Sequence, residues 1–190
     1  TAHSKQYPIH LGFGVEVNKV KKNVYVATDR DFYNSNSLIA KMKDNSVVIV
    51  STPYDTKGAL SLLNWIKKEL KPFKIIAINS HYHPDGTAGN DAFKRNGVEV
   101  WSSEMTKNLV LTEALKLRNE TLRWISTEEL KKRVLNTKIT PASKIFSLNE
   151  GKKFLFEDEE VDVYYPGHAH SADNIVVYFP KKKILFGGCM

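Results

Sequence analysis

The sequence is poor in cysteine and contains no long apolar run. Cys189 is the one cysteine in 190 residues, which excludes an intrachain disulfide and leaves a small buried residue, a reactive thiol or a metal ligand. No apolar stretch approaches the ~20 residues of a membrane-spanning helix, so membrane insertion is not expected. The N-terminal "TAHSKQYPIHLG" lacks the pattern of a signal peptide, which fits either a cytoplasmic protein or one whose leader has been removed.

The chain also lacks low-complexity segments, an obvious linker and a concentrated block of positive charge. Its formal net charge is +7, but lysine and arginine are scattered in short runs, whereas a nucleic-acid binder groups them on one face. A solvated basic surface is favoured, and nucleic-acid binding is a minor alternative. With 42% hydrophobic residues, the chain is long enough for one domain and short for two, so we expect a single domain over residues 1–190.

The first half of the chain predicts strands around an amphipathic helix. Apolar, β-branched segments at 23–28, 37–43 and 46–51 predict three strands, the last two joined by a tight turn at 44–45. Apolar residues at helical spacing from Ala59 to Leu70 predict a helix that Asp55 caps and "KP" ends. The segment "FKIIAINS" then reads as an apolar strand covered on both faces.

The second half predicts a short helix, a longer helical region and several short strands. Residues 104–136 read as two helices, the second opened by a capping box of Ser126 and Glu129. The buried stripe expected on the first of these helices consists of Leu111, Leu115, Leu122 and Ile125. Strands are expected at 98–103, 145–148, 152–156, 161–166, 174–180 and 183–188. This alternation predicts an α/β fold with strands inside and helices outside.

Chemistry-bearing residues concentrate in "NSHYHPDGTAGN", directly after an apolar strand. His81, His83 and Asp85 are spaced two residues apart, and such residues in an extended segment project toward one side. Imidazole nitrogens and a carboxylate suit zinc. The H-x-H-x-D pattern alone is only moderately specific, because two surface histidines in a polar loop would look the same.

Two later segments favour metal binding over surface histidines. His168 and His170 lie in the glycine-containing turn "PGHAHSADN", and Cys189 follows two glycines at the end of another strand. Potential ligands therefore come from three strand-end loops, each with a small-residue turn beside it, and chance placement of such a set is improbable. The sequence predicts a metal site.

These motifs carry a family resemblance. The order H-x-H-x-D-G, P-G-x-x-H-S-x-D-N and G-G-C resembles the metallo-β-lactamase superfamily, and within it the cysteine-containing, two-zinc class B β-lactamases. The resemblance implies that His81, His83 and His170 bind a first zinc and that Asp85 and Cys189 bind a second. His168 occupies a variable position of the motif, and His3 and His10 match nothing in it.

The resemblance also implies a fold and an activity. The fold would be an αββα sandwich with a helical insertion at about 104–136. The activity would be hydrolysis of the β-lactam amide bond by a metal-bound hydroxide that Asp85 orients, of the carbapenemase type that confers antibiotic resistance. The zinc held by Cys189 would stabilise the nitrogen leaving group. A periplasmic, monomeric protein is implied, and the loop at 29–36 makes Phe32 and Tyr33 candidate substrate contacts, with a packing role for either as the alternative.

One expected part is missing from the sequence. Family members complete the second zinc site with a histidine well downstream of the cysteine, whereas this chain ends at Met190 and lacks the strands and helices of the rest of the sandwich. We therefore expect a fragment. Two rival functions stay open: another hydrolase of the superfamily, of the thioesterase or lactonase type, and a non-catalytic zinc-binding domain. Gly86 argues against the first rival, because those relatives carry a histidine there and also lack the late cysteine.

Small and polar residues around the predicted ligands are expected to support the loops. Gly86 and Gly89 would allow close backbone approach where a side chain would obstruct the metal. Asp173 and Asn174 would fix the loop that carries His170, through hydrogen bonds from side chain to backbone.

Overall fold

The computed structural model describes residues 6–189, so His3 and Met190 lie outside the described residues. The strands are β1 Ile9–Gly12, β2 Val15–Lys21, β3 Val24–Asp29, β4 Ser35–Lys41, β5 Ser46–Val50, β6 Lys74–Ile78, β7 Glu99–Ser103, β8 Lys144–Phe146, β9 Lys152–Phe156, β10 Glu159–Tyr164, β11 Val176–Phe179 and β12 Ile184–Phe186. The helices are α1 Thr56–Leu70, α2 Pro84–Thr87, α3 Asn90–Arg95, α4 Glu104–Trp124, α5 Glu128–Leu135 and the 3₁₀ turn η1 Pro180–Lys182.

Two sheets form the centre of the fold. The larger sheet has eight strands in the order β1 to β8; β1 to β5 pair antiparallel, and β5 to β8 pair parallel. The smaller sheet is antiparallel, in the order β12-β11-β10-β9. The change to parallel pairing at β5 brings the carboxyl ends of β5, β6 and β7 to one edge, and the loops that carry chemistry leave from that edge.

Alternating residues of the central strands serve two separate cores. On β5, Val47 and Ile49 face the helical layer, where Leu62 and Ile66 of α1 pack against them. Val48 and Val50 face the second sheet. The strand therefore needs apolar residues at each position from 47 to 50, and the sequence "VVIV" supplies them.

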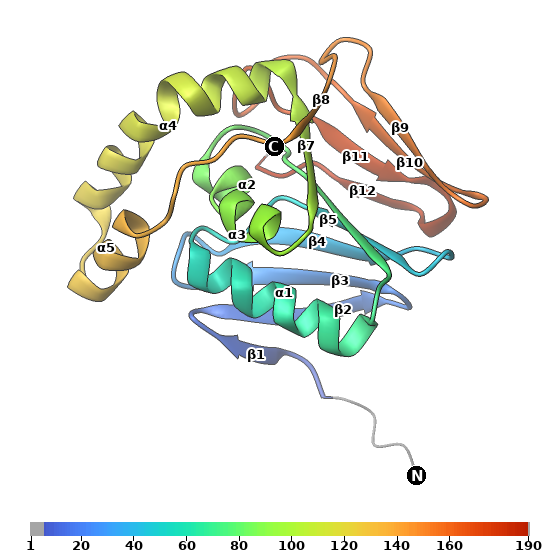
Figure 1. Cartoon of the computed structure of the whole chain (residues 1–190), viewed down its shortest axis with the longest axis horizontal. Helices are drawn as coiled ribbons and strands as arrows, with labels where there is room; N and C mark the ends of the chain where they lie inside the picture. Colours follow the sequence, from blue (N-terminus) through green and yellow to red (C-terminus); the bar gives the residue numbers. More distant parts are fainter. Residues whose placement is uncertain (1–5, 190) are drawn as a thin grey trace.

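The layers appear plainly in Figure 1. Helices α1 and α3 cover the outer face of the larger sheet, and the smaller sheet packs on its other face. In the part of the chain from 6 to 189, no α-helix follows α5, so the fourth layer of the expected αββα sandwich is not among the described residues. Leu155, Tyr164 and Leu185 of the smaller sheet are exposed. None of the described helices is long and apolar enough to cross a bilayer.

The helix that follows β5 matches the sequence prediction. Asp55 is its N-cap and accepts a 2.8 Å hydrogen bond from the backbone N–H of Gly58. Lys71, in the left-handed conformation, ends the helix ahead of Pro72. The strands β3 to β7 also fall where the sequence placed them, within two residues at each end.

Two sequence predictions about the remaining elements are wrong. Leu111 and Leu115 are 63% and 55% exposed, because α4 packs through its smaller residues Val110 and Ala114. The N-cap of α5 is Thr127 and not Ser126: its hydroxyl accepts a hydrogen bond from the N–H of Leu130. The strand expected at 145–148 is present as the shorter β8, Lys144–Phe146, which joins the larger sheet. The pair β1 and β2 was not anticipated.

Candidate metal centre and adjoining cleft

The loop after β6 is held in place by buried polar side chains. The amide of Asn79 donates to the carbonyl of Gly86 at 2.7 Å and to Oδ1 of Asn90 at 2.8 Å. The N–H of Thr52 donates to the carbonyl of Asp85 at 3.2 Å. Pro84 then opens α2, because its fixed φ suits a first helical position. These bonds fix the backbone from 79 to 90, and with it the direction of the side chains between.

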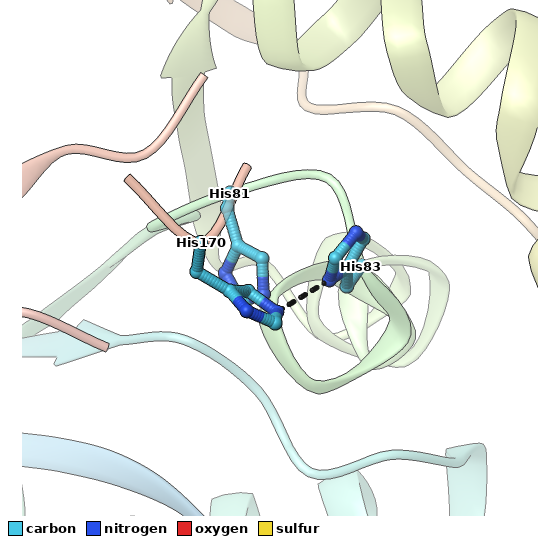
Figure 2. A group of neighbouring side chains, drawn as sticks. All are labelled: His81, His83 and His170. Atoms are coloured by element: carbon cyan, nitrogen blue, oxygen red, sulfur yellow. Dashed lines mark hydrogen bonds between the residues drawn. The ribbon is translucent and has the colours of Figure 1, made fainter. Parts of the chain in front are cut away.

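Three imidazoles meet at this loop. His81 is fully buried; its Nδ1 lies 2.9 Å from the hydroxyl of Ser80, and its Nε2 has no hydrogen-bond partner. Nδ1 of His83 lies 3.0 Å from Nε2 of His170, which comes from the segment between β10 and β11. Figure 2 shows the three rings converging from two segments far apart in the sequence. His81, His83 and His170 thus form a possible metal site, with one nitrogen of each within 4.8 Å of the others.

A second group of potential ligands shares His81 with the first. Oδ1 of Asp85 lies 3.3 Å from Nε2 of His81, and the thiol of Cys189 donates a 3.0 Å hydrogen bond to Oδ2 of Asp85. One ligand atom of each residue falls within 4.8 Å of the others. Cys189 lies three residues after the end of β12, and its thiol meets the carboxylate of Asp85 on α2. The structure therefore brings together all five residues that the sequence nominated.

The electrostatics of the cluster favour ligand chemistry at neutral pH. Burial, and then the neighbouring imidazole of His81, lower the pKa of His83 to about 4, so the ring is neutral at pH 7 and keeps a lone pair on one nitrogen. Burial acts to raise the pKa of Asp85, but contact with His81 and Cys189 outweighs it and lowers that pKa to about 2. Burial and the Asp85 carboxylate raise the pKa of the Cys189 thiol to about 12. A divalent cation reverses that last effect, because a coordinating thiol loses its proton.

The loop that carries His170 has its own supports. Oδ1 of Asn174 accepts a 2.8 Å hydrogen bond from the backbone N–H of Ser171, which confirms the bond predicted from side chain to backbone. Asp173 differs from the prediction, because its carboxylate accepts from the hydroxyls of Ser171 and Thr106, both at 2.7 Å. The second of these bonds ties the loop to the start of α4. His168 is exposed and belongs to neither ligand group.

His10 also lies apart from the site. It sits on β1, where its Nδ1 is 3.6 Å from a carboxylate oxygen of Glu16.

A cleft of about 440 Å³ opens beside the ligand groups. The loop after β3 forms one wall through Tyr33, which is 66% exposed. Phe32 does not line the cleft: it is 2% exposed, and its ring stacks on Tyr54 with centroids 4.7 Å apart. Direct substrate contact, which the sequence suggested for both residues, is therefore open to Tyr33 alone. Phe32 has the packing role.

Sequence reasoning missed the opposite wall of the cleft. Four residues of α4 line it, namely Leu117, Glu120, Thr121 and Trp124. They follow the i, i+3, i+4, i+7 spacing of one helix face, so the pattern was present in the sequence. Leu111, Leu115 and Leu122 have a similar spacing on a different face of the helix, and the sequence analysis took that face as the buried one. Tyr54 was missed as well; its hydroxyl lies 2.7 Å from that of Thr121 and joins the two walls.

The residues present fit a divalent metal such as zinc. The buried Nε2 of His81 has the Asp85 carboxylate at 3.3 Å but makes no well-aligned hydrogen bond, and burying such a polar atom is costly unless something binds it. The donor set of imidazole, carboxylate and thiol is the set that zinc prefers. Ser80, bonded to the far nitrogen of His81, fixes the ring so that Nε2 points at the other donors.

The family follows from comparison with known proteins. Residues 30–190 match the model of the metallo-β-lactamase superfamily, so the chain belongs to this superfamily. A metallo-β-lactamase type 2 from Elizabethkingia meningoseptica is 28% identical over 180 residues, which are 93% of this chain and 62% of that protein. The chain therefore spans less than two thirds of the length of that relative.

Solved structures agree on the fold. A metallo-β-lactamase from Pontibacter korlensis superposes with a TM-score of 0.70 at 31% identity, covering 92% of this chain and 71% of the other. A metallo-β-lactamase from Hirschia baltica gives 0.68 at 26% identity, with the same coverage. The DIM-1 metallo-β-lactamase gives 0.67 at 28% identity, covering 92% and 69%. The mixed α/β fold predicted from the sequence is confirmed, and this chain spans about 70% of the length of these structures.

Proposed function

We propose that the protein hydrolyses the amide bond of β-lactams with zinc held by the five clustered residues. The observation that carries the proposal is the pair of ligand groups that share His81 and open onto one cleft. His81, His83 and His170 would hold a first zinc, and Asp85 and Cys189 would hold a second. Bound zinc lowers the pKa of water toward ~7 and polarises a carbonyl group.

The residues of the chain prepare this chemistry. The pKa of Asp85, lowered to about 2, keeps its carboxylate ionised, so it can accept a hydrogen bond from the attacking water and orient it. Tyr33 and the cleft-facing side of α4 would hold the substrate on either side. No serine nucleophile and no covalent intermediate are required.

Finer features of the proposal rest on resemblance. The phrases "VATDRDFYNSNSLIAKM", "VVIVSTP", "WSSEMTK" and "NIVVYFPKKKILFGGCM" resemble the São Paulo metallo-β-lactamase in particular, as does the helical region at about 104–136. We therefore include carbapenem hydrolysis, a role in antibiotic resistance and a periplasmic location in the proposal. A monomeric state and a single domain over residues 1–190 are also part of it.

One structural observation argues against a lactonase-type or thioesterase-type relative. A Cβ atom at Gly86 would lie 2.5 Å from the carbonyl oxygen of His81 and 3.1 Å from its Nδ1. The histidine that such relatives carry at this position would not fit unless His81 moved. The thiol of Cys189, which such relatives lack, lies 3.0 Å from Oδ2 of Asp85.

The test combines metal content with turnover, because the two separate a catalytic from a non-catalytic zinc protein. The purified protein should bind zinc and hydrolyse a chromogenic cephalosporin, and a chelator should abolish turnover. Asp85→Asn and Cys189→Ser should each lower turnover by more than tenfold. His168→Ala is the matched control: it changes an exposed histidine two residues from His170 and should alter neither measurement. Zinc binding without turnover of any β-lactam would exclude the hydrolase proposal.

A further inference from the structure

The wall of the cleft formed by α4 has a chemical character that the ligand cluster does not explain. Leu117, Glu120 and Trp124 lie on one helix face and all line the cleft. Trp124 is 79% exposed, so the face of its indole is accessible to a ligand in the cleft. Glu120 has the one formally charged side chain among the described cleft-lining residues outside the ligand groups.

The carboxylate of Glu120 has no hydrogen bond or ion pair within the described part of the chain. Lys116 and Arg123 share a neighbouring surface cavity with it, but neither comes within ion-pairing distance. A lysine four residues before a glutamate is also the less favourable order for an ion pair along a helix. Glu120 is half-buried and lines the cleft, its carboxylate is unpaired among the described residues, and Trp124 lies one turn further along the same helix face.

A carboxylate beside an exposed indole is a combination that recognises organic cations. The carboxylate supplies charge, and the face of a tryptophan ring attracts ammonium and similar groups. Tyr33 adds a second exposed aromatic ring to the lining of the same cleft. The polar residues that follow Tyr33 in the cleft lining are Asn34, Ser35 and Asn36. Their side chains are uncharged and do not compete for a cation.

We propose that Glu120 and Trp124 form a subsite for a positively charged substituent of the substrate. This inference rests on the proposed function and narrows it to β-lactams that carry a cationic side arm, such as a quaternary ammonium or pyridinium group. The ligand cluster holds the reacting end, and α4 holds the charged arm. Glu120 and Trp124 determine specificity and take no part in bond breaking.

The test uses two cephalosporins with the same core and acyl group. One has a quaternary ammonium substituent and the other a neutral substituent of similar size. Glu120→Gln should raise KM about 3- to 10-fold for the cationic compound and leave the neutral one unchanged. Trp124→Leu should raise KM for the cationic compound by about 2- to 5-fold more than for the neutral one. The preference should weaken with added salt.

Glu113→Gln is the matched control, because Glu113 lies on α4 outside the cleft lining and its loss should change neither KM. A binding measurement that needs no turnover completes the test. Benzyltrimethylammonium should perturb the NMR signals of the cleft in the wild type and bind more weakly to Glu120→Gln. Equal KM values for both compounds in wild type and variant would overturn the subsite and leave the hydrolase proposal standing. Charge-dependent binding of benzyltrimethylammonium without turnover of any β-lactam would support the subsite and overturn the hydrolase proposal.

Discussion

The guanidinium of Arg133 lies 2.5 Å from Oδ2 of Asp31, although 102 residues separate the two in the sequence. Arg133 also lies 2.5 Å from Asp55, the N-cap of α1, and 5.3 Å from the ring of Phe32. One buried side chain of α5 thus holds the loop after β3 and the start of α1. That loop carries Tyr33, so the helical region from 104 to 136 supports both walls of the cleft.

Arg133→Met tests this arrangement. The change leaves the carboxylate of Asp55 buried without its partner, and breaking a buried ion pair from one side costs about 3 kcal/mol. We expect a loss of that size in the free energy of unfolding, measured with urea. Arg133→Lys should recover only part of it, because one ammonium group cannot contact two carboxylates with the geometry of a guanidinium.

Lys132→Met provides the control for Arg133. It removes a positive charge from the adjacent, exposed position of the same helix, and its effect should stay within about 0.5 kcal/mol. Equal stability of the two variants would show that the buried ion pairs contribute nothing net.

Asp29 gives a prediction about pH. The residue is 2% exposed, and burial, together with the nearby carboxylates of Asp55 and Asp31, raises its pKa from 3.8 to about 7. The folded protein therefore holds a proton between pH 4 and 7 that the unfolded chain has released. The stabilisation that comes from protonated Asp29 is complete below pH 4 and is lost as the pH rises through 7. Across this window the free energy of unfolding falls by up to ~1.4 kcal/mol per pH unit.

Asp29→Asn removes this titration and retains an acceptor for the N–H of Tyr54. The free energy of unfolding of both proteins is measured from pH 4.5 to 8. As the pH rises, the variant should become more stable relative to the wild type. The other titrating groups are the same in both proteins, so their effects cancel in the difference between the two free energies of unfolding. A difference independent of pH would mean that Asp29 is ionised throughout.

The proximity of the five candidate ligands could be anticipated from the sequence because four of them closely follow an apolar strand. His81, His83 and Asp85 follow β6 directly, and Cys189 follows β12 after two glycines. Strand ends are local features, and α/β sheets gather their functional loops at one edge. The contact between His170 and His83 depends on how one sheet packs on the other. Local sequence pattern does not predict that packing, and only the family resemblance indicated it.

Packing between distant elements was not predictable from local pattern. Leu111 and Leu115 formed a convincing stripe, but α4 contacts α2 and β7 through small residues and leaves both leucines exposed. The strands β1 and β2 were missed because Gly12 and Gly14 interrupt them and lysines fill the end of β2. Phe32 and Tyr33 are adjacent and similar, yet only the fold decides which one is buried.

Two glycines beside the ligands should respond differently to the same change. Alanine at position 86 brings a Cβ to 2.5 Å from the carbonyl oxygen of His81, and alanine at position 89 brings one to 2.8 Å from Cβ of Thr52. Each should cost about 1–3 kcal/mol of stability through overpacking. Gly86→Ala should also lower zinc affinity about 10-fold or more, because His81 must move, and Gly89→Ala should not.

Competition of each glycine variant with a chromogenic zinc chelator measures the affinity, and thermal unfolding of the metal-free proteins measures the stability. Unchanged zinc affinity in Gly86→Ala would show that the ring of His81 is not held by the close approach of this backbone.

Phe32 and Tyr33 supply a last pair of contrasting variants. Phe32→Ala empties a fully packed position against Tyr54 and should destabilise the fold by about 3–5 kcal/mol. Tyr33 is exposed at a positive φ of 59°, which asparagine adopts readily, so Tyr33→Asn should change stability by less than about 0.5 kcal/mol. Because its ring lines the cleft, Tyr33→Asn should instead raise KM by about 2- to 10-fold with kcat nearly unchanged. Unfolding curves and steady-state kinetics on both variants separate the two roles, and a Tyr33 variant with wild-type KM for every β-lactam tested would remove Tyr33 from the substrate-binding wall.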